Sequence, residues 1–182
     1  MRIAGLLSMT CALRIAQPAD ALRIAVLGSQ VFLDTYASEG ISQSIAEEAL
    51  EYFTPDAISL QLADASTAFI VAESSGHMVG FAHVVLGMAH PLVSEVGGAK
   101  LNRLYVLERF TGRGIGKSLL LQAEALAASK GAPILWLTAW VGNRRALAFY
   151  PGRGYEDLGA TDYVFQGESF ENRLFAKALQ LS

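Results

Sequence analysis

The chain has 182 residues, a length that suits one domain with a substantial hydrophobic core. Hydrophobic residues make up 52% of it and charged residues 17%, which excludes a disordered chain. The formal net charge of −3 argues against a nucleic-acid partner, because binding to phosphates needs a basic face. The single cysteine, Cys11, allows no disulfide within the chain and predicts a cytoplasmic protein.

Residues 1–16 are largely apolar, which faintly resembles a secretion signal. The apolar stretch is short and Arg14 interrupts it. We therefore prefer a single domain over residues 1–182, in which residues 1–12 form a disordered extension and Met9 is an alternative start. No uncharged run reaches the roughly 18 residues that a membrane span requires, so no membrane partner is predicted.

Hydrophobic periodicity predicts helices and strands in the first half of the chain. The expected elements are a strand at Leu13–Gln17, a helix opened by Pro18, helices at Ser42–Phe53 and Ile58–Ala63, and strands at Ala68–Glu73 and Met78–Leu86. Proline suits the first turn of a helix because that turn needs no N–H donor. The last two strands are expected to form a hairpin around Ser74–His77.

The second half of the chain is also predicted to contain both strands and helices. Its expected elements are a strand at Leu101–Val106, a helix at Ile115–Ser129, a strand at Ile134–Trp140, a short helix at Arg144–Tyr150, and strands at Thr161–Phe165 and Ser169–Ala178. Gly131 suits the end of the long helix, and Gln166-Gly167 suits the turn between the last two strands. The mixture predicts an α/β fold of the α+β type.

A glycine-rich segment, Thr111 to Ser118, joins a predicted strand to a predicted helix. Glycines let backbone N–H groups approach a phosphate, and the start of the helix adds further N–H groups and a positive dipole end. A pyrophosphate suits this arrangement, although a plain turn would use the same residues. A P-loop needs glycine where Thr111 stands, and the G-x-G-x-x-G pattern meets Lys117 when it is read from Gly112, so both are excluded.

A second motif runs from Asn143 to Tyr155 and reads N-R-R-A-L-A-F-Y-P-G-R-G-Y. It resembles the N-x-x-A-x-x-F-Y-x-x-x-G-F/Y motif of the GNAT superfamily of N-acetyltransferases. The segment Thr111–Gly116 resembles the phosphate loop of that superfamily, Q/R-x-x-G-x-G/A, with threonine at the Gln/Arg position. The two motifs occur in the family's order, with a predicted helix and strand between them, and the resemblance covers residues 68–179.

The resemblance implies a GNAT-like fold, a cofactor and its contacts. The sheet is expected to be mixed and mostly antiparallel, flanked by helices, with two parallel central strands that splay to admit the pantetheine of acetyl-CoA. The implied cofactor-binding residues are Leu104, Tyr105, Val106, Thr111, Gly112, Arg113, Gly114, Ile115, Gly116, Lys117, Asn143, Ala146 and Phe149. The N–H of Val106 is expected to hydrogen-bond the acetyl carbonyl. Asn143 equally suits a helix N-cap, and Ala146 and Phe149 equally suit the core.

Tyr150 is the catalytic residue that the second motif implies. Aminolysis of a thioester expels a thiolate, and a nearby phenol can donate a proton to it. The alternative is a tyrosine that anchors a short helix to the core. The implied reaction is direct attack of a primary amine on the thioester.

The attacking amine also needs a group that accepts its proton. Many relatives carry a glutamate on the strand before the glycine loop, but here Lys100 stands near that position and no acidic residue occurs on the strand. Nearby candidates are Glu73, His83, His90 and Glu95, of which His83 has the most suitable ordinary pKa. A chain of water molecules is the alternative.

The acceptor is predicted to be a small-molecule amine. The aromatic segment Val31–Tyr36 resembles the spermidine/spermine acetyltransferase branch, so a polyamine is one candidate, and Phe32 and Tyr36 are candidate acceptor contacts. Acetylation of a protein N-terminus or lysine is the first alternative, and a non-catalytic regulator that binds acyl-CoA is the second. We expect a monomer or homodimer and no metal, because one cysteine and three scattered histidines offer no ligand cluster.

Overall fold

The structure is a computed structural model that describes residues 11–165 and 167–180. The strands are β1 (Cys11–Ile15), β2 (Thr67–Ser74), β3 (His77–Leu86), β4 (Ala99–Val106), β5 (Ile134–Trp140), β6 (Glu156–Phe165) and β7 (Glu168–Ala178). The α-helices are α1 (Ala21–Tyr36), α2 (Gln43–Tyr52), α3 (Pro55–Ala63), α4 (Ile115–Ser129) and α5 (Arg144–Phe149). Short 3-10 turns are η1 (Pro18–Asp20), η2 (Glu108–Phe110) and η3 (Pro151–Arg153). The predicted extension and alternative start at Met9 lie outside the described residues, apart from the last two residues of the extension, which begin β1.

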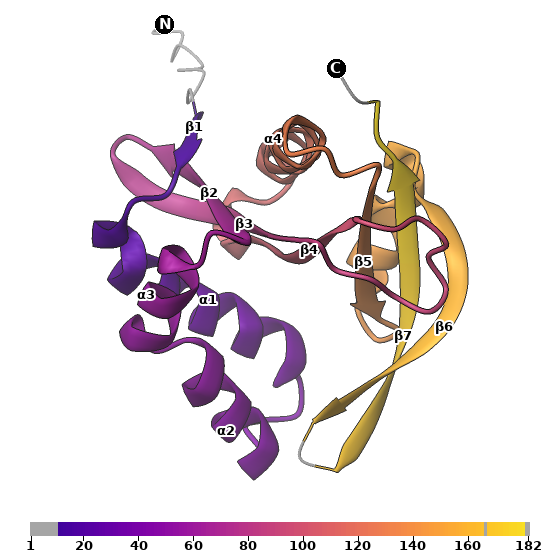
Figure 1. Ribbon diagram of the computed structural model, residues 1–182. Coiled ribbons are helices and arrows are strands. Elements are labelled where there is room, and N and C mark those ends of the chain that lie inside the picture. Colours follow the sequence, from indigo (N-terminus) through magenta and orange to yellow (C-terminus); the bar gives the residue numbers. More distant parts are fainter. Residues whose placement is uncertain (1–10, 166, 181–182) are drawn as a thin grey trace, which may run out of the picture.

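The strands form one seven-stranded sheet in the order β1-β2-β3-β4-β5-β7-β6 (Figure 1). All neighbouring strands are antiparallel except β4 and β5, which are parallel. Helices α1, α2 and α3 cover one face of the sheet and α4 covers the other. The predicted mixed sheet flanked by helices is therefore confirmed.

Two apolar layers hold the helices to the sheet. On one face, Leu119 and Ala123 of α4 are buried with Leu135 of β5. On the other, Ile24 of α1 is buried with Phe81 of β3. Full burial of an aliphatic or aromatic side chain of this size contributes about 1.5–3 kcal/mol. These contacts orient the helices that carry the candidate site.

Polar caps determine where α2 and α3 begin. The hydroxyl of Ser42 accepts a hydrogen bond from Ile45 N at 3.3 Å, and that of Thr54 accepts one from Ala57 N at 3.1 Å. Pro55 occupies the first position of α3, where its missing N–H has no cost. The third helix therefore begins at Pro55, earlier than predicted, because Thr54-Pro55 opens this helix as well as ending the previous one.

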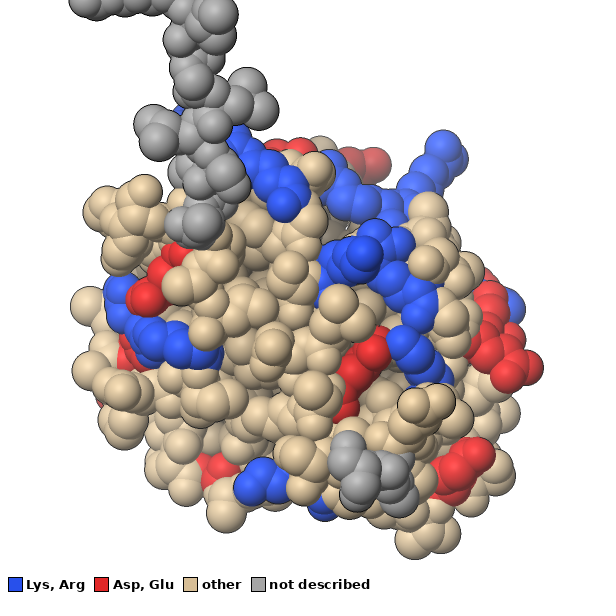
Figure 2. Space-filling view, turned by 90° about the horizontal axis from the view of Figure 1, so that it is seen from above, with Lys and Arg blue, Asp and Glu red and all other residues tan. Residues whose placement is uncertain are grey.

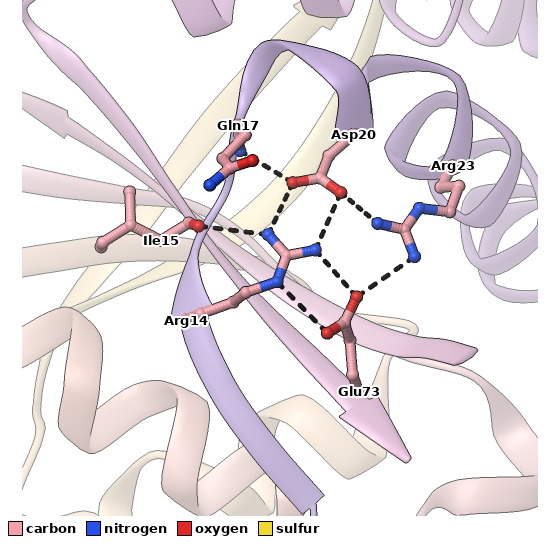
Figure 3. Close-up of polar contacts among 6 residues, drawn as sticks. All are labelled: Arg14, Ile15, Gln17, Asp20, Arg23 and Glu73. Atoms are coloured by element: carbon pink, nitrogen blue, oxygen red, sulfur yellow. Dashed lines mark hydrogen bonds and ion pairs between the residues drawn. The ribbon is translucent and has the colours of Figure 1, made fainter. Parts of the chain in front are cut away.

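A partly buried ion cluster fastens the N-terminal strand to the sheet and to α1 (Figure 3). Arg14 of β1 pairs with Asp20 at 2.7 Å and with Glu73 of β2 at 2.8 Å. Arg23 of α1 pairs with the same two carboxylates. Asp20 also accepts a hydrogen bond from Gln17 N at 2.7 Å, and its side chain is only 2% exposed. The two arginines lower the pKa of Asp20 below its ordinary value.

The central strands β4 and β5 separate along their length. They pair only where Ala99 meets Leu135 and where Lys100 meets Trp136. Beyond these residues both strands continue, β4 to Val106 and β5 to Trp140, without pairing to each other. The predicted splay is present, and its closed end lies at Lys100.

The last hairpin is longer than predicted. β6 begins at Glu156 instead of Thr161, and the register shifts between Asp157 and Gly159, where glycine adopts a φ of +123°. This bulge and the solvent exposure of an edge strand remove the apolar alternation that predicts strands from sequence. The far end of the hairpin reaches α2 (Figure 1), where Tyr163 donates a hydrogen bond to Glu48.

Candidate active site

The glycine segment forms an open turn at the N-terminus of α4. Gly112 and Gly114 have φ angles of +74° and +82°, a left-handed backbone that favours glycine. A Cβ atom added to either glycine would have no neighbouring atom within 4 Å, so the space beside this backbone is open. The Gly114 carbonyl accepts a hydrogen bond from Ser118 N at 3.0 Å. The N–H groups of residues 115–117 have no partner within the helix and suit an anion.

Neighbouring side chains hold this turn in place. The Thr111 hydroxyl donates a hydrogen bond to the Glu108 carbonyl at 2.9 Å, and the Glu108 carboxylate pairs with Arg145 at 2.7 Å. A Cβ atom at Gly116 would lie 3.8 Å from the Phe149 ring. The first turn of α4 therefore packs closely on α5. Threonine at the family's Gln/Arg position has a structural role in stabilising η2.

Basic side chains flank the same turn. They are Arg109, Arg113, Lys117, Arg144 and Arg145. The Arg113 guanidinium carbon lies 5.1 Å from the centroid of the Phe110 ring. Figure 2, which shows the molecule from above, has its largest group of Lys and Arg side chains in the upper right, with others at the left and lower edges. The chain is acidic in total, yet this region offers positive charge to a group with several phosphates.

The end of β4 directs backbone groups into the gap between the central strands. Leu107 N donates a hydrogen bond to Val79 O of β3 at 2.9 Å. Adjacent residues of a strand direct their backbone groups to opposite sides, so the N–H of Val106 points away from β3, toward the gap. The side chains of Leu104 and Val106 pack in the layer beneath α4, and that of Tyr105 packs on the α1 face.

Asn143 begins α5. Its Oδ1 atom accepts a hydrogen bond from Ala146 N at 3.0 Å, which is an N-cap. Ala146 and Phe149 are partly buried against the apolar layer beneath α4. The guanidinium carbon of Arg153 lies 4.2 Å from the centroid of the Phe149 ring. These residues therefore have the structural roles that the sequence left open, and they lie next to the open turn.

Tyr150 follows α5 and is 7% exposed. Its ring contacts Phe149, Tyr155 and Phe175, with centroid distances of 5.2, 5.6 and 5.9 Å. Burial raises the pKa of the Tyr150 hydroxyl, and the nearby Tyr36 raises it further. The phenol therefore keeps its proton at neutral pH, as a hydrogen-bond donor must.

The predicted acceptor residues of α1 occupy different environments. Phe32 is buried, with its ring centroid 5.6 Å from that of Phe53 at the end of α2. Tyr36 is partly exposed, and its ring centroid lies 5.7 Å from that of Trp140 at the end of β5. Phe32 therefore belongs to the core between two helices. Tyr36 reaches across to the far side of the splayed strands.

Glu48 of α2 was missed by the sequence analysis. Its Oε1 atom accepts a hydrogen bond from the Tyr163 hydroxyl at 2.9 Å. Burial raises the pKa of Glu48, while Tyr163 and the charge of Arg103 oppose the rise. Glu48 in turn raises the pKa of Tyr36. The sequence does not distinguish a partly buried glutamate on an amphipathic helix from a glutamate on the solvated face of that helix.

His83 lies in the sheet on the α1 face. It is 2% exposed, and its ring stacks on Phe69 with a centroid distance of 4.0 Å. Asn102 Nδ2 lies 3.2 Å from His83 Nδ1. Burial, together with the charges of Arg103 and Lys100, lowers the pKa of His83 to about 3. The imidazole is therefore neutral at physiological pH but too weak a base to take a proton from an ammonium group.

Within residues 11–165 and 167–180, no helix is long and apolar enough to cross a membrane. In the same ranges, no group of three or more His, Cys, Asp or Glu side chains is arranged to hold a metal ion.

Comparisons with known proteins identify the family. Residues 32–155 match the model of the acetyltransferase (GNAT) family, and the chain belongs to that family. The N-alpha-acetyltransferase RimI of Mycobacterium tuberculosis is 30% identical over 142 residues, which cover 78% of this chain and 75% of RimI. An uncharacterized N-acetyltransferase from the pepI 3′ region of Lactobacillus delbrueckii subsp. lactis is 23% identical, covering 88% of this chain and 92% of its own length.

A solved structure agrees in fold. The PaiA N-acetyltransferase of Thermoplasma acidophilum, in complex with coenzyme A, superposes with a TM-score of 0.74 at 21% identity, covering 93% of this chain and 99% of that one. Membership of the acetyltransferase (GNAT) family makes the protein an N-acetyltransferase with acetyl-CoA as acetyl donor. The open turn at Gly112 and Gly114, the basic side chains beside it and the splayed strands fit this cofactor. Membership of an enzyme family favours catalysis over the predicted alternative of a non-catalytic regulator.

Proposed function

We propose that the protein acetylates a small primary amine. Bound acetyl-CoA supplies an activated acetyl thioester, which the amine attacks directly. The observation that favours a small acceptor is the contact between the last hairpin and α2. Tyr163 of β6 donates to Glu48 of α2 at 2.9 Å, and Ser44 of α2 donates to Glu168 of β7 at 3.2 Å. These contacts bridge the α1–α2 side of the splay, where an extended peptide would need an open groove.

The proposed cofactor contacts follow from the backbone. Gly112 to Lys117 supply N–H groups and a helix dipole for the pyrophosphate. The Val106 N–H, pointing into the gap, would donate to the acetyl carbonyl, where it stabilises negative charge as the amine attacks. Leu104 and Tyr105 form the adjacent edge of that gap. Asn143 would contact the pantetheine through the amide nitrogen, because its oxygen caps α5.

Tyr150 is proposed as the proton donor to the leaving sulfur. Its raised pKa keeps the proton on the phenolic oxygen at neutral pH, so the hydroxyl can donate a hydrogen bond to the negative charge that develops on the leaving sulfur. Its ring is fixed by aromatic neighbours, so the hydroxyl is held without loss of side-chain entropy in the reaction. No described residue of β4 offers a carboxylate as base. We therefore propose that water carries the amine's proton away.

One acceptor class competes with this proposal, and one candidate lies within it. The likeness to RimI favours the α-amino group of a protein N-terminus. A polyamine, which the segment at residues 31–36 suggests, is a small-amine candidate. An assay of thiol release from acetyl-CoA with spermidine, simple diamines, amino acids and short peptides distinguishes them at equal concentrations. The proposal predicts that a small amine has the largest kcat/KM. Faster acetylation of peptides at their α-amino group would contradict it.

A further inference from the structure

A β-bulge places two basic side chains of β4 on the same face of the sheet. Simple alternation would direct Lys100 and Arg103 to opposite faces. The pairing of β3 with β4 shifts register between His83 and Val84, so Asn102 is an extra residue. Leu101 on one side of the bulge and Leu104 on the other both pack beneath α4. Lys100 and Arg103 consequently both face the α1–α2 side.

Neither cation forms an ion pair among the described residues. Among residues 11–165 and 167–180, every ion pair involves other basic side chains. The Lys100 ammonium lies 5.4 Å from the centroid of the Trp136 ring. The Arg103 guanidinium carbon lies 5.3 Å and 4.9 Å from the ring centroids of Tyr52 and Phe53. Both side chains are partly buried against aromatic rings, where a charge without a counter-ion is costly.

The two cations also affect the pKa values of neighbouring groups. Burial lowers the pKa of Lys100, and the charge of Arg103 lowers it further. The charge of Lys100 also helps to lower the pKa of His90. Burial raises the pKa of Glu48, and the charge of Arg103 opposes this rise. The Glu48 carboxylate also accepts a hydrogen bond from Tyr163. Glu48 offsets Arg103 in part, whereas no described carboxylate offsets Lys100.

Both cations lie on β4, the strand that also carries Val106. Lys100 is the last residue of β4 that pairs with β5, so it lies at the closed end of the splay. We infer that Lys100 and Arg103 bind a carboxylate of the acceptor, which is then an amine of the amino-acid class rather than a polyamine. This inference rests on the proposed small-amine activity. A carboxylate would supply the missing counter-charge, and Arg103 can bind one in bidentate fashion.

Matched acceptors and variants test the inference. Lysine and alanine are compared with lysinamide and alaninamide, which lack the carboxylate, and with spermidine. The enzymes are the wild type, Lys100→Met and Lys130→Met, the last being a control at the exposed end of α4. We expect the wild type to prefer the amino acids. Lys100→Met should raise KM for amino acids about tenfold or more, as expected for a lost charged hydrogen bond, and leave KM for carboxamides within about twofold. Lys130→Met should change neither.

A second variant distinguishes loss of the carboxylate contact from loss of folding. Arg103→Lys keeps the charge but loses the bidentate fork, so it should raise KM for amino acids and keep the melting temperature near that of the wild type. Preference of the wild type for carboxamides or spermidine would overturn the inference alone. So would an equal fall in kcat for every acceptor in Lys100→Met, which would assign Lys100 to proton transfer. Absence of thiol release with any amine, despite acetyl-CoA binding, would overturn the proposed function and this inference together.

Discussion

The ring of Tyr36 packs against that of Trp140, with centroids 5.7 Å apart. The contact joins the end of α1 to the end of β5 across the opening between the central strands. Tyr36 also lies close enough to Tyr150 to raise the pKa of its hydroxyl. An amine that enters from the α1–α2 side would therefore meet Tyr36 before it reaches the proposed proton donor.

Truncation of Tyr36 should affect the acceptor and not the cofactor. In Tyr36→Ala, KM for the amine should rise about tenfold because the amine loses its contact with the Tyr36 ring. KM for acetyl-CoA should stay unchanged. Phe32→Ala is the control: it should lower the free energy of unfolding by about 3–5 kcal/mol, since Phe32 is buried. Steady-state kinetics and thermal unfolding measure the two effects. A Tyr36→Ala variant that is less stable but kinetically normal would place Tyr36 in the core.

Substitution of Gly114 should weaken cofactor binding. Gly114→Asp adds a side chain and a negative charge beside the proposed pyrophosphate site. Calorimetry should therefore show that Kd for coenzyme A rises at least about tenfold, which is a loss of about 1.4 kcal/mol of binding free energy. Gly131→Asp is a matched control because Gly131 has the same φ of +82° at the opposite end of α4. It should lower stability but leave affinity intact. Equal affinity losses in both variants would mean that backbone strain, and not the site, explains the effect.

Removal of the Tyr150 hydroxyl should lower kcat. A positioned proton donor contributes about 10²–10⁴-fold, so Tyr150→Phe should lose a factor in that range while binding acetyl-CoA normally. In Tyr155→Phe, the lost hydroxyl donates to Glu124 at 3.0 Å, so that variant should lose stability and keep kcat. If Tyr150→Phe instead raises KM for acetyl-CoA at constant kcat, Tyr150 is a binding residue.

The ion cluster of the N-terminal strand should make stability depend on pH. The pKa of Asp20 is lower in the folded chain than in the unfolded chain. Its stabilisation is therefore complete above the ordinary pKa of about 3.9 and is lost as the pH falls below it. Asp20→Asn should cost about 1.5–3 kcal/mol at pH 7 because the neutral amide loses charged hydrogen bonds to Arg14 and Arg23, while Glu73 still pairs with both arginines. Asp157→Asn breaks a pair that is more than one-third exposed, 38% and 35% for the two side chains, and should cost at most about 1 kcal/mol. Urea unfolding at several pH values measures both.

The imidazole of His83 should not titrate near neutrality. Its folded pKa of about 3 predicts constant NMR shifts of the ring between pH 5 and 8, roughly the range in which a solvated histidine changes charge. Because the unfolded chain binds this proton at higher pH than the folded one, His83 disfavours folding progressively as the pH falls from about 6.5 toward 3. A titration midpoint near 6.5 would show that the ring is solvated.

The sequence predicted most elements because local signals agreed with tertiary packing. The helix at Ile115–Ser129 and the strand at Ile134–Trp140 have the predicted bounds. The apolar period of the helix matches the face it buries, and glycines in left-handed conformations mark its two ends. The splay of the central strands was implied by resemblance and could not have followed from periodicity alone.

The acceptor side of the site was less predictable. Alternation gives no indication that Asn102 is the extra residue of a bulge, so Lys100 and Arg103 could not be assigned to one face. Likewise, the contact of Glu48 with Tyr163 joins residues far apart in the chain. Such contacts depend on where the last hairpin ends relative to α2, which no local pattern reports.

The central claim is that acetyl groups pass from acetyl-CoA to a small primary amine. It is tested most directly by incubating the protein with isotopically labelled acetyl-CoA and an equimolar mixture of amino acids, polyamines and peptides, then identifying the labelled product by mass spectrometry. We predict that the label is found on the amino group of a small amine, and that Tyr150→Phe forms far less of the same product. Label found on peptide α-amino groups, or on no amine while free thiol still accumulates, would contradict the account.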